Sequence, residues 1–307
     1  MNASFLRRTP GPRNLSQARF FVLCAVCAIC EPGPMSGGTR IPERRDSLLA
    51  VTVESLDAKL AVLEQAVQET TNNPANMQSA AKFDALYEML HMIPCFSRED
   101  VTPIQMKAQP VFLAALQQAP SIPLCRMLVS CWSAFFEHGK DLQLMSTINA
   151  IHAKLGEKDP KPTGKNADAS AQNRVLMQRM SYLHALGQLC KRHPYQVRPY
   201  LPDTLTLCAK HLKSDIQPGV RVVALQTMHD TLDGVGPNAV QKWNPELYKA
   251  ISRCTTDRAP DVKEAAALCL SVFATCNLPL LRDSLEGVVS LCVKPMDDPS
   301  PQVRRAL

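Results

Sequence analysis

A seven-residue pattern occurs three times in the last third of the chain and constrains the fold more than any other feature. Its copies occupy 215–221, 257–263 and 298–304. In each copy a Pro follows an Asp by three positions, a Val follows it by five, and an Arg or Lys follows the Val. The copies begin 42 and 41 residues apart. Self-similarity at a fixed spacing of this length indicates a structural repeat.

The residue types in the pattern predict a turn between two helices. The Asp carboxylate can accept hydrogen bonds from backbone N–H groups that the next helix leaves unpaired. Proline is tolerated in the first turn of a helix, where its missing N–H has no cost. The Val begins the apolar face, and the basic residue can reach carboxylates in the loop or in a neighbouring repeat. The predicted structural repeat positions are Asp215, Pro218, Val220, Arg221, Asp257, Pro260, Val262, Lys263, Asp298, Pro301, Val303 and Arg304.

A period of about 40 residues is typical of HEAT or armadillo-type helical hairpins. Apolar residues make up 46% of the 307-residue chain and aromatic residues 5%, which suits helices packed through aliphatic side chains. In such an array each hairpin contacts only its neighbours, so the core grows by stacking. The sequence therefore predicts an all-α fold, an α-solenoid of antiparallel helical hairpins with a disordered N-terminal extension.

Apolar spacing and breaker residues divide the chain into four segments. Residues 1–45 form a disordered or targeting-like extension, and 46–155 form N-terminal helical hairpins. The polar stretch 156–173 is predicted to be a disordered loop. HEAT repeats fill 174–307, and the last helix is expected to be truncated. The predicted helices span 46–70, 78–92, 104–118, 124–137, 141–155, 174–191, 203–213, 220–232, 245–254, 261–274 and 280–293. A further helix is predicted to start at Pro301.

The positive charge is concentrated at the N-terminus. Residues 1–45 hold seven Arg and two Glu, whereas the remainder holds 27 basic and 26 acidic residues. The predicted solenoid is therefore almost neutral, which argues against a nucleic-acid partner. The apolar run at 20–30 is shorter than the roughly 20 residues that a membrane-spanning helix needs. It resembles part of a signal or transit peptide, and the alternative is that translation begins at Met35.

No catalytic, metal or cofactor site stands out from the sequence. Nucleotide loops, nucleophile elbows and zinc-protease motifs are absent, and we predict a non-catalytic protein with no cofactor. The Cys24, Cys27 and Cys30 cluster lacks the second pair of ligands that a zinc site needs. Other cysteines lie in apolar helical runs, where free Cys behaves as a small hydrophobe. Trp132, Phe135 and Phe136 are predicted to pack between hairpins, with a binding pocket as the alternative.

From residue 104 to the C-terminus the chain resembles the N-terminal region of a known family. These are the very large HEAT-repeat proteins that accompany clathrin adaptors, the Laa family, called HEAT repeat-containing protein five in animals. The matching stretches are 123–128 with Trp132, 141–149, 246–249, 256–258, 262–263, 285–292 and 303–304. The resemblance covers about two-thirds of the chain and only a small part of a family member. The extension at 1–45, the loop at 156–173 and the early end depart from the family.

The resemblance implies a cytoplasmic accessory protein of the clathrin adaptor complex, peripheral at Golgi and endosomal membranes. Such a scaffold would support sorting between the trans-Golgi network and endosomes. The alternative is another HEAT scaffold, such as a nuclear transport receptor, a phosphatase scaffold or a tubulin-binding array. An enzyme would instead require a polar pocket close to His184 or His193.

Overall fold

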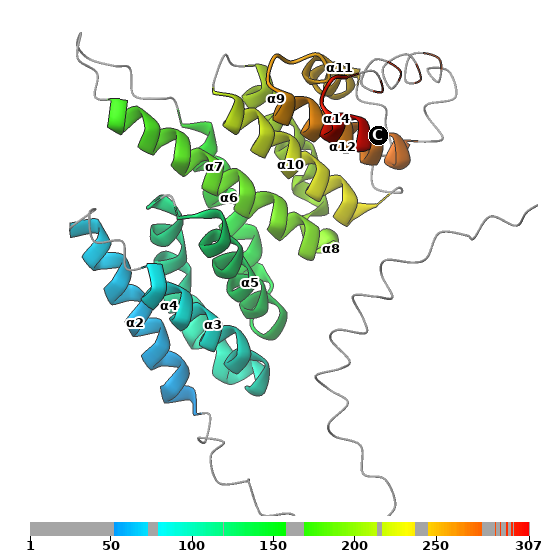
Figure 1. Cartoon of the computed structure of the whole chain (residues 1–307). Helices are drawn as coiled ribbons and strands as arrows, with labels where there is room; N and C mark the ends of the chain where they lie inside the picture. Colours follow the sequence, from blue (N-terminus) through cyan, green and yellow to red (C-terminus); the bar gives the residue numbers. More distant parts are fainter. Residues whose placement is uncertain are drawn as a thin grey trace, which may run out of the picture. The chain divides into compact units, whose positions relative to one another are not determined.

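The computed structural model describes residues 52–72, 79–118, 120–157, 169–213, 217–236, 245–277 and 298–306, with positions 286, 289, 293 and 296. Within these residues the regular structure is entirely helical. The predicted extension at 1–45 lies outside them, and so do Asp215 and most of the predicted helix 280–293. The described helices follow one another in chain order from α2 (blue) to α12 (orange) in Figure 1.

Helices alternate between two layers, as hairpins of a solenoid should. The first layer contains α2 (Val53–Asn72), α4 (Arg98–Gln117), α6 (Leu142–Gly156), α9 (Leu201–Lys213) and α11 (Pro245–Cys254). The second contains α3 (Ser79–Met92), α5 (Ile122–His138), α7 (Ala169–Arg192), α10 (Pro218–Val235), α12 (Pro260–Asn277) and the short α14 (Pro301–Arg305). The segments η1 (Ile93–Cys95), α8 (Pro194–Val197) and η2 (Arg198–Tyr200) connect some of them.

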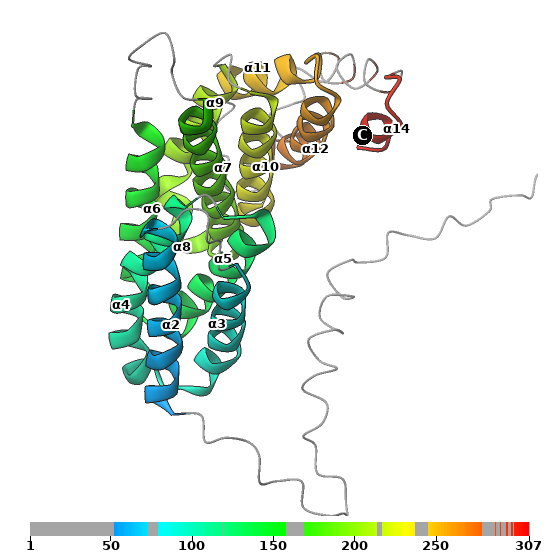
Figure 2. The ribbon, with the colours of Figure 1, turned by 60° about the vertical axis from the view of Figure 1, so that its left-hand side comes forward.

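Contacts along the second layer hold the repeats together. Each of its helices packs on the next in chain order, α3 on α5, α5 on α7, α7 on α10, α10 on α12 and α12 on α14. In the first layer α2 packs on α4, and α9 packs on both α6 and α11. Figure 2 shows α7, α10 and α12 following one another in this way. Because neighbouring hairpins bury one another's apolar faces, the all-α solenoid predicted from the repeat is confirmed.

Close backbone approach marks the α7–α10 contact. Gly187 and Gly234 lie where these two helices meet. A Cβ atom added to Gly234 would stand 2.6 Å from Lys191 Cα, and one added to Gly187 would stand 2.9 Å from Thr227 Cα. Both distances are shorter than a van der Waals contact, so these positions require glycine for the observed packing.

Several predicted boundaries were wrong. The helix predicted at 46–70 begins instead at Val53, where Thr52 Oγ1 accepts the Ser55 N–H at 3.2 Å. The predicted helix at 104–118 begins instead at Arg98, because Ser97 caps it: Ser97 Oγ accepts a hydrogen bond from the Asp100 N–H at 3.3 Å. The Ser97 to Asp100 spacing is that of a helix start, and Pro103 lies inside the helix. The predicted loop 156–173 is also too long. Helix α7 begins at Ala169, because the prolines and glycines of that stretch end at Gly164 and the following residues tolerate helical structure.

Candidate functional site

The repeated turns bring oppositely charged side chains of successive repeats together. Arg221 on α10 binds Asp257 through two hydrogen bonds, Nε to Oδ2 at 2.9 Å and Nη2 to Oδ1 at 3.0 Å. The Oδ1 atom also accepts the backbone N–H of Ala259 at 3.0 Å. One carboxylate therefore closes its own turn and anchors the preceding repeat.

The next turn repeats this arrangement. Lys263 on α12 donates to Asp298 Oδ2 at 2.6 Å, and Asp298 Oδ1 accepts the Ser300 N–H at 2.9 Å. Arg304 on α14 donates to the backbone carbonyls of Asp298 and Pro299 at 2.6 and 3.0 Å. We call Arg221, Asp257, Lys263, Asp298 and Arg304 the acidic-turn ladder.

The other predicted repeat positions start the second-layer helices. Pro218, Pro260 and Pro301 are the first residues of α10, α12 and α14. Their side chains preset the backbone angle of the first helical turn. Val220, Val262 and Val303 are fully buried. Each copy of the repeated pattern thus combines a helix start with the first core contact of that helix. Asp215 lies outside the described residues.

The ladder carboxylates are held in the charged form. Burial raises the pKa of Asp257, but the Ala259 N–H and the Arg221 guanidinium lower it more strongly, so the pKa lies below its usual range. Hydrogen bonds from Lys263 and from the Ser300 N–H likewise lower the pKa of Asp298. Side chains of Arg221 and Asp257 are 17% and 15% exposed. The Arg221–Asp257 pair is less exposed to solvent than a surface ion pair, so it can stabilise the stacking of the repeats. A carboxylate that stays charged in this way is not suited to proton transfer.

Aromatic side chains in the N-terminal hairpins form core rather than a pocket. Trp132, Phe135 and Phe136 are all buried on α5, which confirms the prediction that they pack between hairpins. The Trp132 ring meets Phe112 of α4 edge to face, with centroids 5.4 Å apart. Phe112 also lies against Phe135 at 5.9 Å. Such edge-to-face pairs add to the stabilisation from buried area.

A serine and a histidine lie close together in this core. Ser133 Oγ stands 2.6 Å from His193 Nε2, and the hydroxyl also lies 3.3 Å from Glu137 Oε1. Ser133 is only 1% exposed and His193 only 4%. A nucleophile needs access to its substrate, so this contact joins α5 to the start of α8 and offers no place for a reaction.

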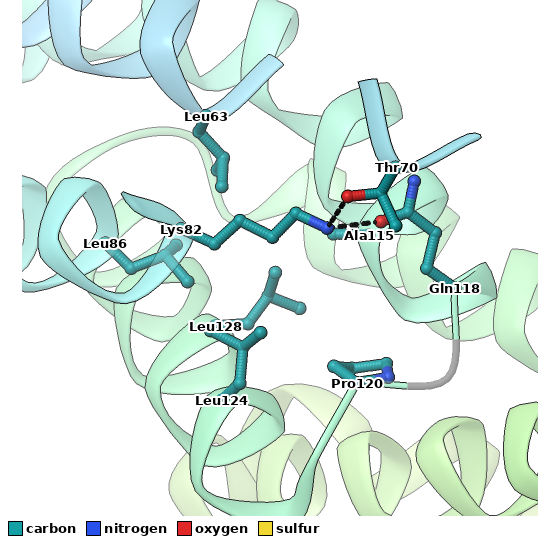
Figure 3. Close-up of a pocket in the computed structure, with 9 residues that line it drawn as sticks. All are labelled: Leu63, Thr70, Lys82, Leu86, Ala115, Gln118, Pro120, Leu124 and Leu128. Carbon is teal, nitrogen blue, oxygen red and sulfur yellow. Dashed lines mark hydrogen bonds between the residues drawn. The ribbon is translucent and has the colours of Figure 1, made fainter. Parts of the chain in front are cut away.

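Two hollows lie between the first two hairpins. A groove of about 440 Å³ runs between α2 and α4, crossed by the ion pair of Lys107 and Asp57. The second is a cavity of about 20 Å³ beside Lys82 (Figure 3), which is room for about one water molecule. Neither hollow is lined by His184 or His193. Throughout the described ranges, no group of three His, Cys, Asp or Glu side chains could hold a metal ion.

The cysteines predicted to lie in apolar helical runs are buried and unpaired where the structure describes them. Cys125, Cys131, Cys190, Cys208 and Cys269 are free and buried, while Cys292 lies outside the described residues. Burial raises the pKa of Cys125 and Cys190 to about 12. A thiol with so high a pKa is not a nucleophile, so these side chains act as core residues.

Comparison with known proteins gives a distant curated relative and solved structures of low similarity. No protein-family profile matches the chain. Among solved structures it is similar to an engineered protein, with 12% identity, coverage of 82% of this chain and 93% of that one, and a TM-score of 0.43. It is also similar to a designed armadillo repeat protein in complex with the peptide (KR)4, with 16% identity, coverage of 80% and 95%, and a TM-score of 0.42.

The stacked hairpins and the acidic-turn ladder define a helical-repeat solenoid of the armadillo or HEAT type, a class of fold used by scaffold proteins. The chain is similar to the protein SWEETIE of Arabidopsis thaliana, with 24% identity over 226 residues. The match covers 73% of this chain and 10% of SWEETIE, so the chain spans a tenth of that relative's length. Among the described helices, none is both long and apolar enough to span a lipid bilayer.

Proposed function

We propose that the protein is a non-catalytic helical-repeat scaffold that serves as an accessory factor of the clathrin adaptor complex. It would act in protein sorting between the trans-Golgi network and endosomes, at the cytoplasmic face of these membranes. The finer part of this proposal rests on the order and spacing of the motifs that resemble the Laa family, several of which lie in the ladder turns.

The observation that supports a scaffold is that Arg221 and Lys263 each pair with the carboxylate of the following repeat. Such pairing fixes one hairpin on the next, so the outer faces of the helices form one continuous surface. A continuous surface suits binding of a partner helix or an extended peptide segment. The contact between Ser133 and His193 is instead enclosed in the core.

The test is affinity purification of the tagged full-length gene product from cells, followed by mass spectrometry. We expect enrichment of clathrin adaptor subunits over an unrelated helical-repeat protein purified in parallel. The variant with Asp257→Ala and Arg221→Ala should recover fewer adaptor subunits, because it weakens the stack on which the continuous surface depends. Recovery of adaptor subunits at background level with the unaltered chain, or of phosphatase subunits or nuclear transport cargo in their place, would contradict the proposal.

A further inference from the structure

Lys82 is a buried basic residue, and no carboxylate among the described residues pairs with it. Its residue is only 6% exposed. Its Nζ atom donates to two neutral oxygens, Thr70 Oγ1 at 2.8 Å and Gln118 Oε1 at 2.6 Å (Figure 3). Buried charges in proteins are normally paired with an opposite charge, so a charged Lys82 needs compensation from other groups around it.

The two acceptors mark the C-terminal ends of two helices. Thr70 lies in the last turn of α2, and Gln118 is the residue that follows α4 and caps it. Neither helix has a basic residue of its own in its last turn. The last carbonyl groups of a helix carry partial negative charge, which a nearby cation stabilises. Lys82 occupies the position of that cation for both helices at once.

Hydrogen bonds of Gln118 complete the connection. Its Nε2 atom donates to Val67 O at 2.5 Å and to Thr71 Oγ1 at 2.9 Å, both on α2. Thr70 Oγ1 in turn donates to Ala66 O at 2.9 Å. The C-terminal ends of α2 and α4 are therefore joined to each other and to Lys82 on α3.

We propose that Lys82, Thr70 and Gln118 form a charge-dependent junction that fixes the first hairpin on the second. In this Lys82 junction the C-terminal ends of α2 and α4 replace the missing carboxylate. The consequence is that the charge of one side chain, and not only its shape, sets the placement of α2 and α3 against α4 and α5.

An opposing effect makes the proposal testable. Burial lowers the pKa of Lys82, because an ammonium group loses hydration in an apolar cavity. The remaining lining residues are not ionisable: Leu63 and Thr70 on α2, Leu86 on α3, Ala115 and Gln118 at the end of α4, and Pro120, Leu124 and Leu128 at α5. If the free-energy cost of desolvating Lys82 exceeded the stabilisation from the helix ends and the hydrogen bonds, an apolar residue at this position would make the protein more stable.

The decisive experiment compares Lys82→Met with Lys107→Met by hydrogen–deuterium exchange of the full chain. Lys107 also connects α4 to α2, through Asp57 at 2.8 Å, but it is 61% exposed. We expect Lys82→Met to raise the exchange of amides at the ends of α2 and α4 by about ten- to a hundredfold. Lys107→Met should leave them almost unchanged. Unchanged or slower exchange in Lys82→Met would overturn the proposal.

A second measurement uses the unaltered protein and does not depend on how the variant folds. In NMR spectra of the chain labelled with 13C and 15N at its lysines, we expect the Lys82 ammonium to be protonated at neutral pH. Its N–H protons should exchange slowly with solvent because they are buried and bonded. A neutral Lys82 amine at pH 7 would contradict a charge-dependent junction.

Discussion

Breaking the bond between Arg221 and Asp257 tests whether the ladder stabilises the stack. The two side chains share two hydrogen bonds of 2.9 and 3.0 Å and are 17% and 15% exposed. Hydrogen bonds to charged groups contribute about 1.5–3 kcal/mol each when water is largely excluded, whereas exposed ion pairs contribute about 0–1 kcal/mol. We therefore expect a coupling energy of about 1–3 kcal/mol between Arg221 and Asp257.

A double-mutant cycle with Arg221→Met and Asp257→Asn measures this coupling from urea unfolding followed by circular dichroism. The single variant Asp257→Ala should lose about 1 kcal/mol more than Asp257→Asn, because it also removes the acceptor of the Ala259 N–H. The matched control cycle is Lys107→Met with Asp57→Asn, a pair that is 61% and 44% exposed. A coupling at Arg221 no larger than that at Lys107 would refute the reasoning.

Three further outcomes follow from the packing and the charges. Gly234→Ala should destabilise the protein by about 1–3 kcal/mol in urea unfolding, because its Cβ would stand 2.6 Å from Lys191 Cα. The control Gly156→Ala, whose Cβ would meet nothing within 4 Å, should be neutral or stabilising. Equal effects of the two substitutions would contradict the close approach of α7 and α10. Phe112→Ala should lower the free energy of unfolding by about 3–5 kcal/mol, since Phe112 is fully buried against Trp132. A decrease below about 1 kcal/mol in the same assay would argue against tight packing around Phe112. The pKa of Asp257 is lowered in the folded state, so the unfolded chain takes up a proton first as the pH falls, and the protein loses stability as the pH drops through and below the ordinary pKa of about 3.9. Asp257→Asn should make the melting temperature depend less on pH in this range, and an unchanged dependence would disprove the contribution.

The chain alone determined the class of fold and the local form of its turns. A fixed spacing between Asp257 and Asp298, with a Pro and a Val at constant positions after each, specifies where a helix must start and which face is apolar. These signals act within a few residues, so no distant contact is needed to interpret them. The burial of the helical cysteines and of Trp132 followed from the same apolar spacing.

The start of α4 has a local signal in the sequence, although the predicted bounds place it six residues too late. The cap at Ser97 was visible in the sequence as Ser97 followed three positions later by Asp100. The predicted start at residue 104 is too late, because proline is disfavoured inside a helix but Pro103 is accommodated inside α4.

Only the tertiary structure decided which groups meet. The stacking of α10 on α12 brings Arg221 to Asp257, a pairing that the local sequence does not specify. Lys82 had no sequence signal at all: it becomes a buried junction because α2, α3, α4 and α5 converge on it. Hydrophobic periodicity sets which face of a helix is covered, whereas the partner of a charged side chain depends on the angle and register between helices that lie far apart in the chain.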